Sequence, residues 1–369
     1  MKRPHFLTFT VTNDLSYDQR MIRICTTLAH AGYRVSIVGR LLSSSLPLKT
    51  QPFRQFRLKC FFNKGPLFYA EFNIRLLFYL LFHRADLICA IDLDTIIAVY
   101  LASKLKSAHR VYDAHELFCE MKEVVSRPRV FKWWKSIEKK IVPRFHNGYT
   151  VNQLIADEFS RLYGVSYAVI RNLPVKSPDI PIVKQNSRKI ILYQGAVNEG
   201  RSFETLIPAM NHIDAKLIIC GDGNFMSQAR NLTTLNNLQH KVIFTGWLEP
   251  DKLRQYTRTA DVGVNIIEDN GLNNRYSLSN RFFDYIQAEL PQVCVNYPAY
   301  QSVNNQYHCA VLIDDTSSVS IAQAINRLLN DHDLYHQLKT NCAIARKQLT
   351  WNNEEPKLLG FYKRILNGR

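Results

Sequence analysis

Residues 189–223 read KIILYQGAVNEGRSFETLIPAMNHIDAKLIICGDG, and this stretch decides the fold. Two apolar runs of strand length are each followed by a glycine and are separated by a segment with helical spacing. A strand, a helix and a second strand in this order form a parallel unit. A glycine directly after each strand lets the chain turn tightly and lets a ligand approach the backbone. The stretch therefore predicts a doubly wound α/β domain.

The same alternation continues on both sides of this stretch. Four further strand-like runs follow it, at 241–247, 261–267, 291–296 and 309–314. Six precede it, at 6–11, 35–38, 86–92, 110–115, 148–152 and 167–172. Residues 173–188 contain three prolines and have no clear period, which is typical of a linker. We expect two Rossmann-like parallel sheets that face each other across a cleft, in domains 1–172 and 189–350.

Composition limits the class of protein. Hydrophobic residues make up 46% and charged residues 21% of the 369 residues, as in globular proteins, and the net charge is +16. Most of the positive excess lies in residues 1–170, which favours one basic face over a nucleic-acid-binding surface along the whole chain. The eight cysteines include no C-x-x-C pair, which indicates buried free thiols of a reducing compartment. The longest uncharged apolar run is too short to span a bilayer.

Three segments of the second half have the composition of an anion-binding site. They are QGAVNEGRS (194–202), CGDGN (220–224) and SLSNRFFDYIQAELP (277–291). Each follows a strand or begins a helix, where main-chain N–H groups favour a diphosphate. The candidate residues are Gly195, Gly200, Arg201, Gly221, Gly223, Asn280, Arg281 and Asp284. Taken alone, the glycines also fit simple turns, the arginines ion pairs, and Asp284 a solvated helix residue.

Together these pieces resemble the GT-B glycosyltransferases, in particular the retaining family 4 group of bacterial polysaccharide biosynthesis. The resemblance rests on ILYQGAVNEGRSFETLIPAM, AKLIICGDGN, KVIFTGWLEPDKLRQYTRTADVGV and SNRFFDYIQAELPQV in the second half. In the first half it rests on YDQRMIRICTTLAHAGYRVSIVGR, DLICAIDLDT, VYDAHELF and YTVN. The closing TWNNEEPKLLGFYKRIL resembles the helix that crosses back to the first domain, here residues 351–369.

The resemblance implies a role for several donor-site residues. Asp284 takes the place of the acid that binds the nucleotide ribose, but Tyr276 stands where the family has its first acidic residue. Glu268 is our candidate substitute for that residue. Ala196 and Glu199 stand where the family has a phosphate-binding Arg and Lys, so Arg201 and Arg281 are our substitutes. Main-chain groups near Gly246 are expected to contact the base.

The first domain is expected to hold the acceptor. In the resembling enzymes a histidine in the position of His115 lies near the reacting sugar, where it could bind a hydroxyl or shuttle a proton with a pKa near 6.5. The alternative is a histidine satisfied by Asp113 or Glu116. Arg20 is a further candidate that could approach the diphosphate, with surface exposure as the alternative.

Residues 127–146, RPRVFKWWKSIEKKIVPRFH, combine many cations with aromatic residues, as do residues 53–64 and 74–84. On a helix, Val130, Trp133, Trp134 and Ile137 would form an apolar stripe beside a basic face, which is typical of a helix on an anionic membrane. An ordinary domain helix with aromatic core residues fits as well.

The resemblance implies a hexosyltransferase that moves a sugar from a nucleotide-diphosphate sugar to a glycan or lipid-linked acceptor, with retention and without a metal or other cofactor. Its expected location is the cytoplasm or the inner face of the cytoplasmic membrane, and nucleic acid is not an expected partner. A nucleotide-sugar epimerase of similar architecture remains an alternative, as does a non-catalytic basic membrane- or nucleic-acid-binding protein.

Overall fold

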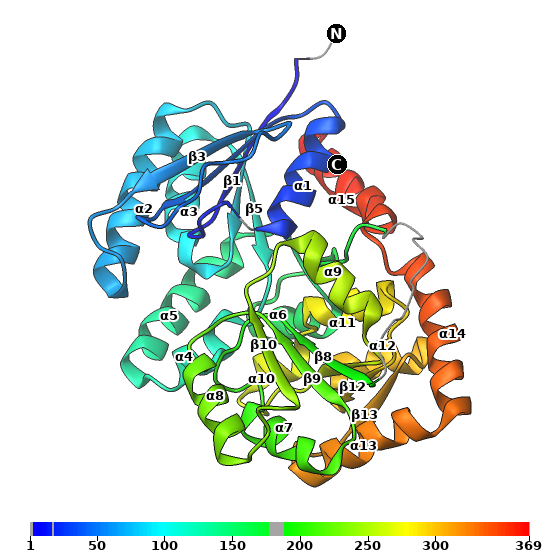
Figure 1. Ribbon diagram of the computed structural model, residues 1–369. Helices are drawn as coiled ribbons and strands as arrows, with labels where there is room; N and C mark the ends of the chain where they lie inside the picture. Colours follow the sequence, from blue (N-terminus) through cyan, green and yellow to red (C-terminus); the bar gives the residue numbers. More distant parts are fainter. Residues whose placement is uncertain (1–2, 17, 177–187, 369) are drawn as a thin grey trace. The chain divides into compact units, whose positions relative to one another are not determined.

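The computed structural model describes residues 3–16, 18–176 and 188–368 and divides the chain into two units (Figure 1). Unit 1 consists of Met1–Asn172 and Asn353–Arg369, and unit 2 consists of Leu173–Asn352. Each unit contains one parallel sheet with its own core. The predicted linker lies largely outside the described residues.

Unit 1 has a seven-stranded sheet in the order β3-β2-β1-β4-β5-β6-β7. Its strands are β1 Phe6–Thr10, β2 Arg34–Leu41, β3 Arg54–Lys59, β4 Leu87–Ile91, β5 His109–Ala114, β6 Gly148–Thr150 and β7 Ala168–Val169. Its helices are α1 Gln19–His30, α2 Gly65–Phe82, α3 Ile96–Lys106, α4 Lys122–Val125, α5 Pro128–Ile141, α6 Gln153–Tyr163 and α15 Trp351–Leu366. Every described pairing in the sheet is parallel, as the strand–helix alternation predicts.

Helix α15 completes unit 1 although it lies at the other end of the chain. The Thr27 hydroxyl of α1 donates a hydrogen bond of 2.8 Å to Glu355, and the hydroxyls of Tyr149 and Tyr362 are 3.1 Å apart. Figure 1 shows α15 beside α1. Tyr362 is fully buried, so the last helix supplies part of the core of the first sheet.

Unit 2 has a six-stranded sheet in the order β10-β9-β8-β11-β12-β13. Its strands are β8 Ile190–Gln194, β9 Lys216–Cys220, β10 Val242–Gly246, β11 Val262–Asn265, β12 Gln292–Val295 and β13 Ala310–Ile313. Its helices are α7 Phe203–Ala209, α8 Met226–Leu235, α9 Pro250–Thr259, α10 Leu272–Tyr276, α11 Asn280–Gln287, α12 Pro298–Tyr307, α13 Ser318–Asn330 and α14 His332–Gln348.

In both sheets the strand order reverses beside the first strand of the unit. This reversal lies between β1 and β4 in unit 1 and between β8 and β11 in unit 2. In open parallel sheets, ligands bind at the carboxyl ends of the strands on either side of such a reversal. The functional residues of each unit are therefore to be sought where these strands end.

Two further observations concern the expectations about cysteines and membranes. All eight cysteines are free thiols, and all except Cys60 are buried. Among the described residues, no helix is both long and apolar enough to cross a membrane.

Candidate functional site

In unit 2, the loops after β8 and β9 fit against each other through glycines. Gly195 and Gly221 have φ of +120° and +147°, a region that side chains rarely adopt. A Cβ on Gly221 would lie 1.9 Å from the Gly195 carbonyl oxygen, and one on Gly223 would lie 2.4 Å from that of Val197. Close packing of the two loops thus requires Gly221 and Gly223. Their predicted role in letting a ligand approach stays a prediction.

The loop after β10 joins the same group. Gly246 has φ +71° and accepts a hydrogen bond of 2.9 Å from the Gly221 N–H. The Val197 N–H donates to the Asp222 carbonyl at 3.0 Å. The structure therefore brings the predicted glycines of three successive strands together at the carboxyl edge of one sheet.

Arg281 is the cation that the structure places at this edge. It is the second residue of α11 and is only 7% exposed. Its guanidinium carbon lies 4.2 Å from the centre of the Tyr193 ring, and its group is 3.8 Å from the position of a Cβ on Gly195. Nη1 of Arg281 is buried without a hydrogen-bond partner. Burial opposes the charge, but Tyr193 and Tyr285 outweigh it and raise the pKa, so the group stays a cation.

Asp284 follows Arg281 by one helical turn and is held by the end of β8. The Gln194 side-chain N–H donates to Asp284 Oδ2 at 2.9 Å, and the Thr257 hydroxyl donates to Gln194 Oε1 at 2.7 Å. Sequence reasoning missed Gln194, although its position directly before Gly195 was a signal. The chain Thr257–Gln194–Asp284 fixes one carboxylate oxygen at the switch point of the sheet.

Glu268 lies in the loop after β11 and reaches the loop after β8. Its N–H donates to the Gly200 carbonyl at 3.1 Å, and its carboxylate accepts a bond of 2.8 Å from the Asn270 amide. Tyr276, the residue in the place of the family's first acid, is the last residue of α10. The structure thus brings Glu268 to the predicted phosphate loop, while its catalytic role stays a prediction.

The remaining predicted residues of this site are less constrained. Arg201 is half-buried in the loop after Gly200, and Asn280 is exposed at the start of α11. Ser202, which follows Arg201, was not predicted from the sequence. It has φ +55°, is 1% exposed, and its hydroxyl has no hydrogen-bond partner. A strained backbone and an unsatisfied hydroxyl in a loop at a sheet edge are typical of a functional position.

In unit 1, His115 lies between two carboxylates after β5. Its Nε2 is 3.2 Å from Asp113 Oδ2, and its Nδ1 is 3.4 Å from Asp92 Oδ2. Burial lowers the pKa of His115, but Asp113 and then Asp92 more than compensate and raise it to about 9. The pKa of His115 thus lies above its ordinary value near 6.5, and Asp113 is a partner of the ring as the alternative expects. At neutral pH the ring is an imidazolium, which can donate hydrogen bonds but cannot accept a proton.

Arg20 takes part in the same cluster. It is 5% exposed, so the alternative of surface exposure is wrong. Its Nη2 donates to Asp113 Oδ1 at 2.9 Å, and its Nη1 donates to the Ile170 carbonyl at 3.3 Å. These contacts make Arg20 a partner of Asp113 within unit 1. The approach of Arg20 to a diphosphate stays a prediction, and its contacts with Asp113 and Ile170 do not support it.

Sequence reasoning missed the two acids at the end of β4. Asp92 has φ 55° and ψ 177°, a strained conformation for a residue with a side chain. Asp94 accepts a hydrogen bond of 2.5 Å from the Thr12 hydroxyl at the end of β1. Burial raises the pKa of both Asp92 and Asp94 to about 7. The run DLDT directly after a buried strand was the available signal.

Two parallel-sheet units, each with a polar cluster where its strand order reverses, define the GT-B class of protein. Residues 19–173 match the model of Glycosyltransferase Family 4, and residues 179–344 match the model of Glycosyl transferases group 1. The chain therefore belongs to these glycosyltransferase families.

An uncharacterized glycosyltransferase of Methanocaldococcus jannaschii is 25% identical over 189 residues, which are 48% of this chain and 46% of that protein. The chain thus matches about half the length of this relative.

Solved structures agree on the fold over the whole chain. Sucrose-phosphate synthase of Thermosynechococcus elongatus is 18% identical with a TM-score of 0.81, and the alignment covers 100% of both chains. Anabaena HepE in complex with UDP and glucose is 14% identical with a TM-score of 0.75, over 97% of this chain and 99% of that one. A putative UDP-N-acetylglucosamine 2-epimerase of Listeria monocytogenes is 10% identical with a TM-score of 0.67, over 100% and 98%. These likenesses show the fold alone.

Proposed function

We propose that this chain transfers a hexose from a nucleotide-diphosphate sugar to a glycan or lipid-linked acceptor in cell-surface polysaccharide assembly. The observation that carries the proposal is the buried, unpartnered Nη1 of Arg281 at the switch point of unit 2. A buried cation with an unused donor is costly unless a ligand satisfies it, and a diphosphate supplies both the charge and the acceptor oxygens.

The other residues of unit 2 fit the remaining parts of such a donor. Asp284, whose Oδ2 accepts a hydrogen bond from the Gln194 side chain, is our candidate for contact with a ribose hydroxyl. Glu268, next to Gly200, is our candidate for contact with the donor sugar. HepE was solved with UDP and glucose, which supports a nucleotide-sugar donor here.

For unit 1 we propose that the His115 imidazolium, whose two ring nitrogens face Asp92 and Asp113, places positive charge beside a sugar hydroxyl of the acceptor. Asp92 and Asp113 hold the charge on this ring, so it stabilises negative charge on oxygen instead of acting as a base. Retention then requires that the departing phosphate oxygen accept the proton of the acceptor hydroxyl. Retention, independence from a metal and a cytoplasmic location remain parts of the proposal.

The first test is a thermal-shift panel of UDP, GDP and ADP and their sugars. A ligand that binds only the folded state raises the melting temperature, by about 5 °C at saturating concentration for a unit of this size. We expect one nucleotide to stabilise the native chain and Arg281→Ala to abolish the effect. Arg327→Ala removes an exposed arginine of α13 and is the matched control.

Arg281→Lys keeps the charge but loses the forked donors, so we expect weaker binding by roughly tenfold or more with an intact fold. An unchanged nucleotide shift in both Arg281 variants would contradict the assignment. The reaction class is tested with labelled nucleotide sugar and a lipid extract. Label in the lipid or glycan fraction supports transfer, whereas a new nucleotide sugar identifies an epimerase.

A further inference from the structure

Helix α2 of unit 1 is apolar on both of its faces. Phe68, Phe72, Leu76 and Leu80 recur at intervals of four residues and are buried against the rest of the unit. On the opposite face, four large apolar side chains are exposed by 56–83%: Leu67, Ile74, Phe78 and Phe82. A helix that is apolar all round is normally buried on all sides. The exposed row of α2 therefore indicates a surface that a partner covers.

The turn before α2 extends this row. Phe61 and Phe62 are 81% and 46% exposed, and their N–H groups donate to the Glu71 carboxylate at 2.9–3.0 Å. Arg75 donates to the same carboxylate at 2.8 Å and lies over the Phe61 ring. Glu71 thus holds both phenylalanines beside the helix. We name Phe61, Phe62, Leu67, Ile74, Phe78 and Phe82 the α2 face.

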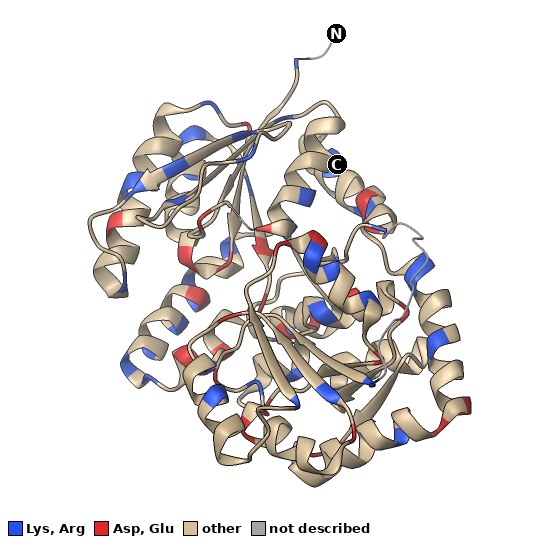
Figure 2. Cartoon of the chain, viewed as in Figure 1, with Lys and Arg blue, Asp and Glu red and all other residues tan. Residues whose placement is uncertain are grey.

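The charges around the α2 face are positive. Residues 49–64 contain no Asp or Glu but include the cations Lys49, Arg54, Lys59 and Lys64. Arg57 in the same segment pairs with Asp14 at 3.0 Å, so its charge is balanced within unit 1. Figure 2 shows Lys and Arg along β3 and near the ends of α2. The acid on the face itself, Glu71, has its charge taken up by Arg75 and by two N–H groups. An apolar row flanked by cations matches the interface of an anionic bilayer, where rings enter the headgroup region and cations meet lipid phosphates.

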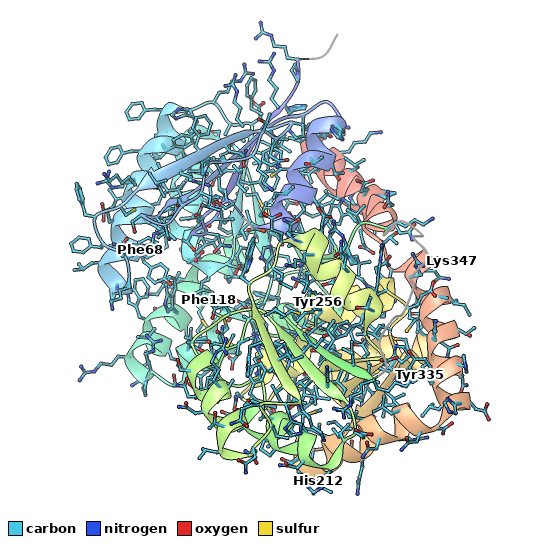
Figure 3. The ribbon with its side chains drawn as sticks, viewed as in Figure 1. Phe68, Phe118, His212, Tyr256, Tyr335 and Lys347 are labelled. Atoms are coloured by element: carbon cyan, nitrogen blue, oxygen red, sulfur yellow. The ribbon has the colours of Figure 1, made fainter. Side chains whose placement is uncertain are left out.

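Helix α5, the element that the sequence indicates for this purpose, fits less well. Trp134 is 4% exposed and packs its ring against Tyr69 and Phe118, so it is a core residue. Trp133 is 49% exposed. The expected stripe of four apolar residues is therefore wrong for Trp134. Figure 3 shows the side chains that project from α2, with Phe68 of the buried row labelled.

Helix α2, which carries most of the α2 face, is also connected to the polar cluster of unit 1. Asn73 of α2 donates to the Asp94 carbonyl at 2.8 Å and accepts from the Ala98 N–H at 3.4 Å. A bilayer against α2 would thus lie close to the carboxyl edge of the first sheet. We propose that unit 1 docks through the α2 face onto the surface of an anionic membrane. If the proposed function holds, this membrane would also contain the lipid-linked acceptor; this last point rests on the proposed function.

The test is flotation of the full chain with two kinds of vesicle, phosphatidylcholine alone and phosphatidylcholine with about one third phosphatidylglycerol. We expect strong binding to the anionic vesicles only. Ile74→Glu/Phe78→Glu should weaken it by roughly tenfold or more, and Lys59→Gln/Lys64→Gln should weaken it and reduce its dependence on salt. Leu235→Glu, which changes a side chain 78% exposed in α8 of unit 2, is the matched control and should bind as the native chain does.

Three results would overturn the proposal. One is unchanged flotation of the Ile74→Glu/Phe78→Glu variant, and another is equal binding of the native chain to both kinds of vesicle. The third is a native chain that is dimeric in gel filtration, does not float, and becomes monomeric in this variant, because the α2 face would then join two copies. Nucleotide-induced thermal shifts of the same variants should be unchanged, so failure of membrane docking can be told apart from failure of the proposed function.

Discussion

Among the residues that the structure describes, two arginines are almost fully buried, and their surroundings assign them opposite roles. Arg20 has a carboxylate, Asp113, within hydrogen-bond distance, so its charge is balanced inside unit 1. Arg281 lies over the Tyr193 ring and keeps Nη1 without a partner. Both residues were equally plausible ligands from the sequence. The difference depends on residues about 90 positions away in the chain, Asp113 for Arg20 and Tyr193 for Arg281, and no local pattern reveals it.

His115 yields a prediction about pH. Its pKa is raised from 6.5 to about 9, so the folded state holds a proton that the unfolded state releases near 6.5. The stabilisation by this proton is fully present below about pH 6.5 and disappears as the pH rises through about 9. Converted at 1.36 kcal/mol for each pKa unit, it amounts to at most about 3 kcal/mol. His115→Gln should therefore lower the free energy of unfolding near pH 6 and do much less near pH 10.

Urea unfolding at both pH values measures this difference. His109→Gln, which changes an exposed histidine at the start of β5, is the control and should shift stability little at either pH. Equal destabilisation by His115→Gln at the two pH values would mean that packing, and not the imidazolium between Asp92 and Asp113, explains the loss.

At the scale of elements, the sequence predicts the strands and helices that have one apolar face and misses those that do not. Strand β3, RQFRLK, alternates charged with apolar residues at a sheet edge, and helix α2 has no single apolar stripe because both of its faces are apolar. Helix α15, Trp351–Leu366, contains Pro356 in its interior. Gly195 and Gly221 were found because each directly follows a strand. Their packing partners were not, because these lie on neighbouring strands.

The fit between the loops after β8 and β9 leads to a prediction about stability. Gly221→Ala places a Cβ 1.9 Å from the Gly195 carbonyl oxygen at φ +147°, so the loops must separate. We expect the free energy of unfolding to fall by more than about 2 kcal/mol. Gly360→Ala is the matched control, because that glycine lies within α15 with nothing within 4 Å of its Cβ position. It should stabilise the chain by about 0.5–1 kcal/mol. A Gly221→Ala variant as stable as the native chain would contradict the close fit.

At the scale of the whole molecule, the chain builds one parallel sheet, then a second, and returns to the first. The repeated alternation in the sequence predicts both sheets. It does not predict which side chains of α15 enter the first core, because the helix pattern alone does not identify the partner. Tyr362 is fully buried, and its ring centre lies 5.9 Å from that of Phe9 in the first strand. Unit 1 therefore depends on residues that come last in the chain.

Tyr362→Ala tests this dependence. Removing a buried aromatic ring should destabilise unit 1 by about 3–5 kcal/mol, because the cavity next to Phe9 and Tyr149 cannot fill completely. Unit 2 has its own core, so its local stability should not change. Hydrogen exchange measures the stability of each unit separately. Amides of β1 and β6 in unit 1 should exchange faster, while those of β8 in unit 2 keep their protection. Tyr362→Phe retains the ring and loses the hydroxyl, which lies 3.1 Å from that of Tyr149 and interacts with Cys89, so it should cost about 1 kcal/mol. Equal loss of protection in β8 would mean that the two units unfold as one, and independent cores would then be the wrong description.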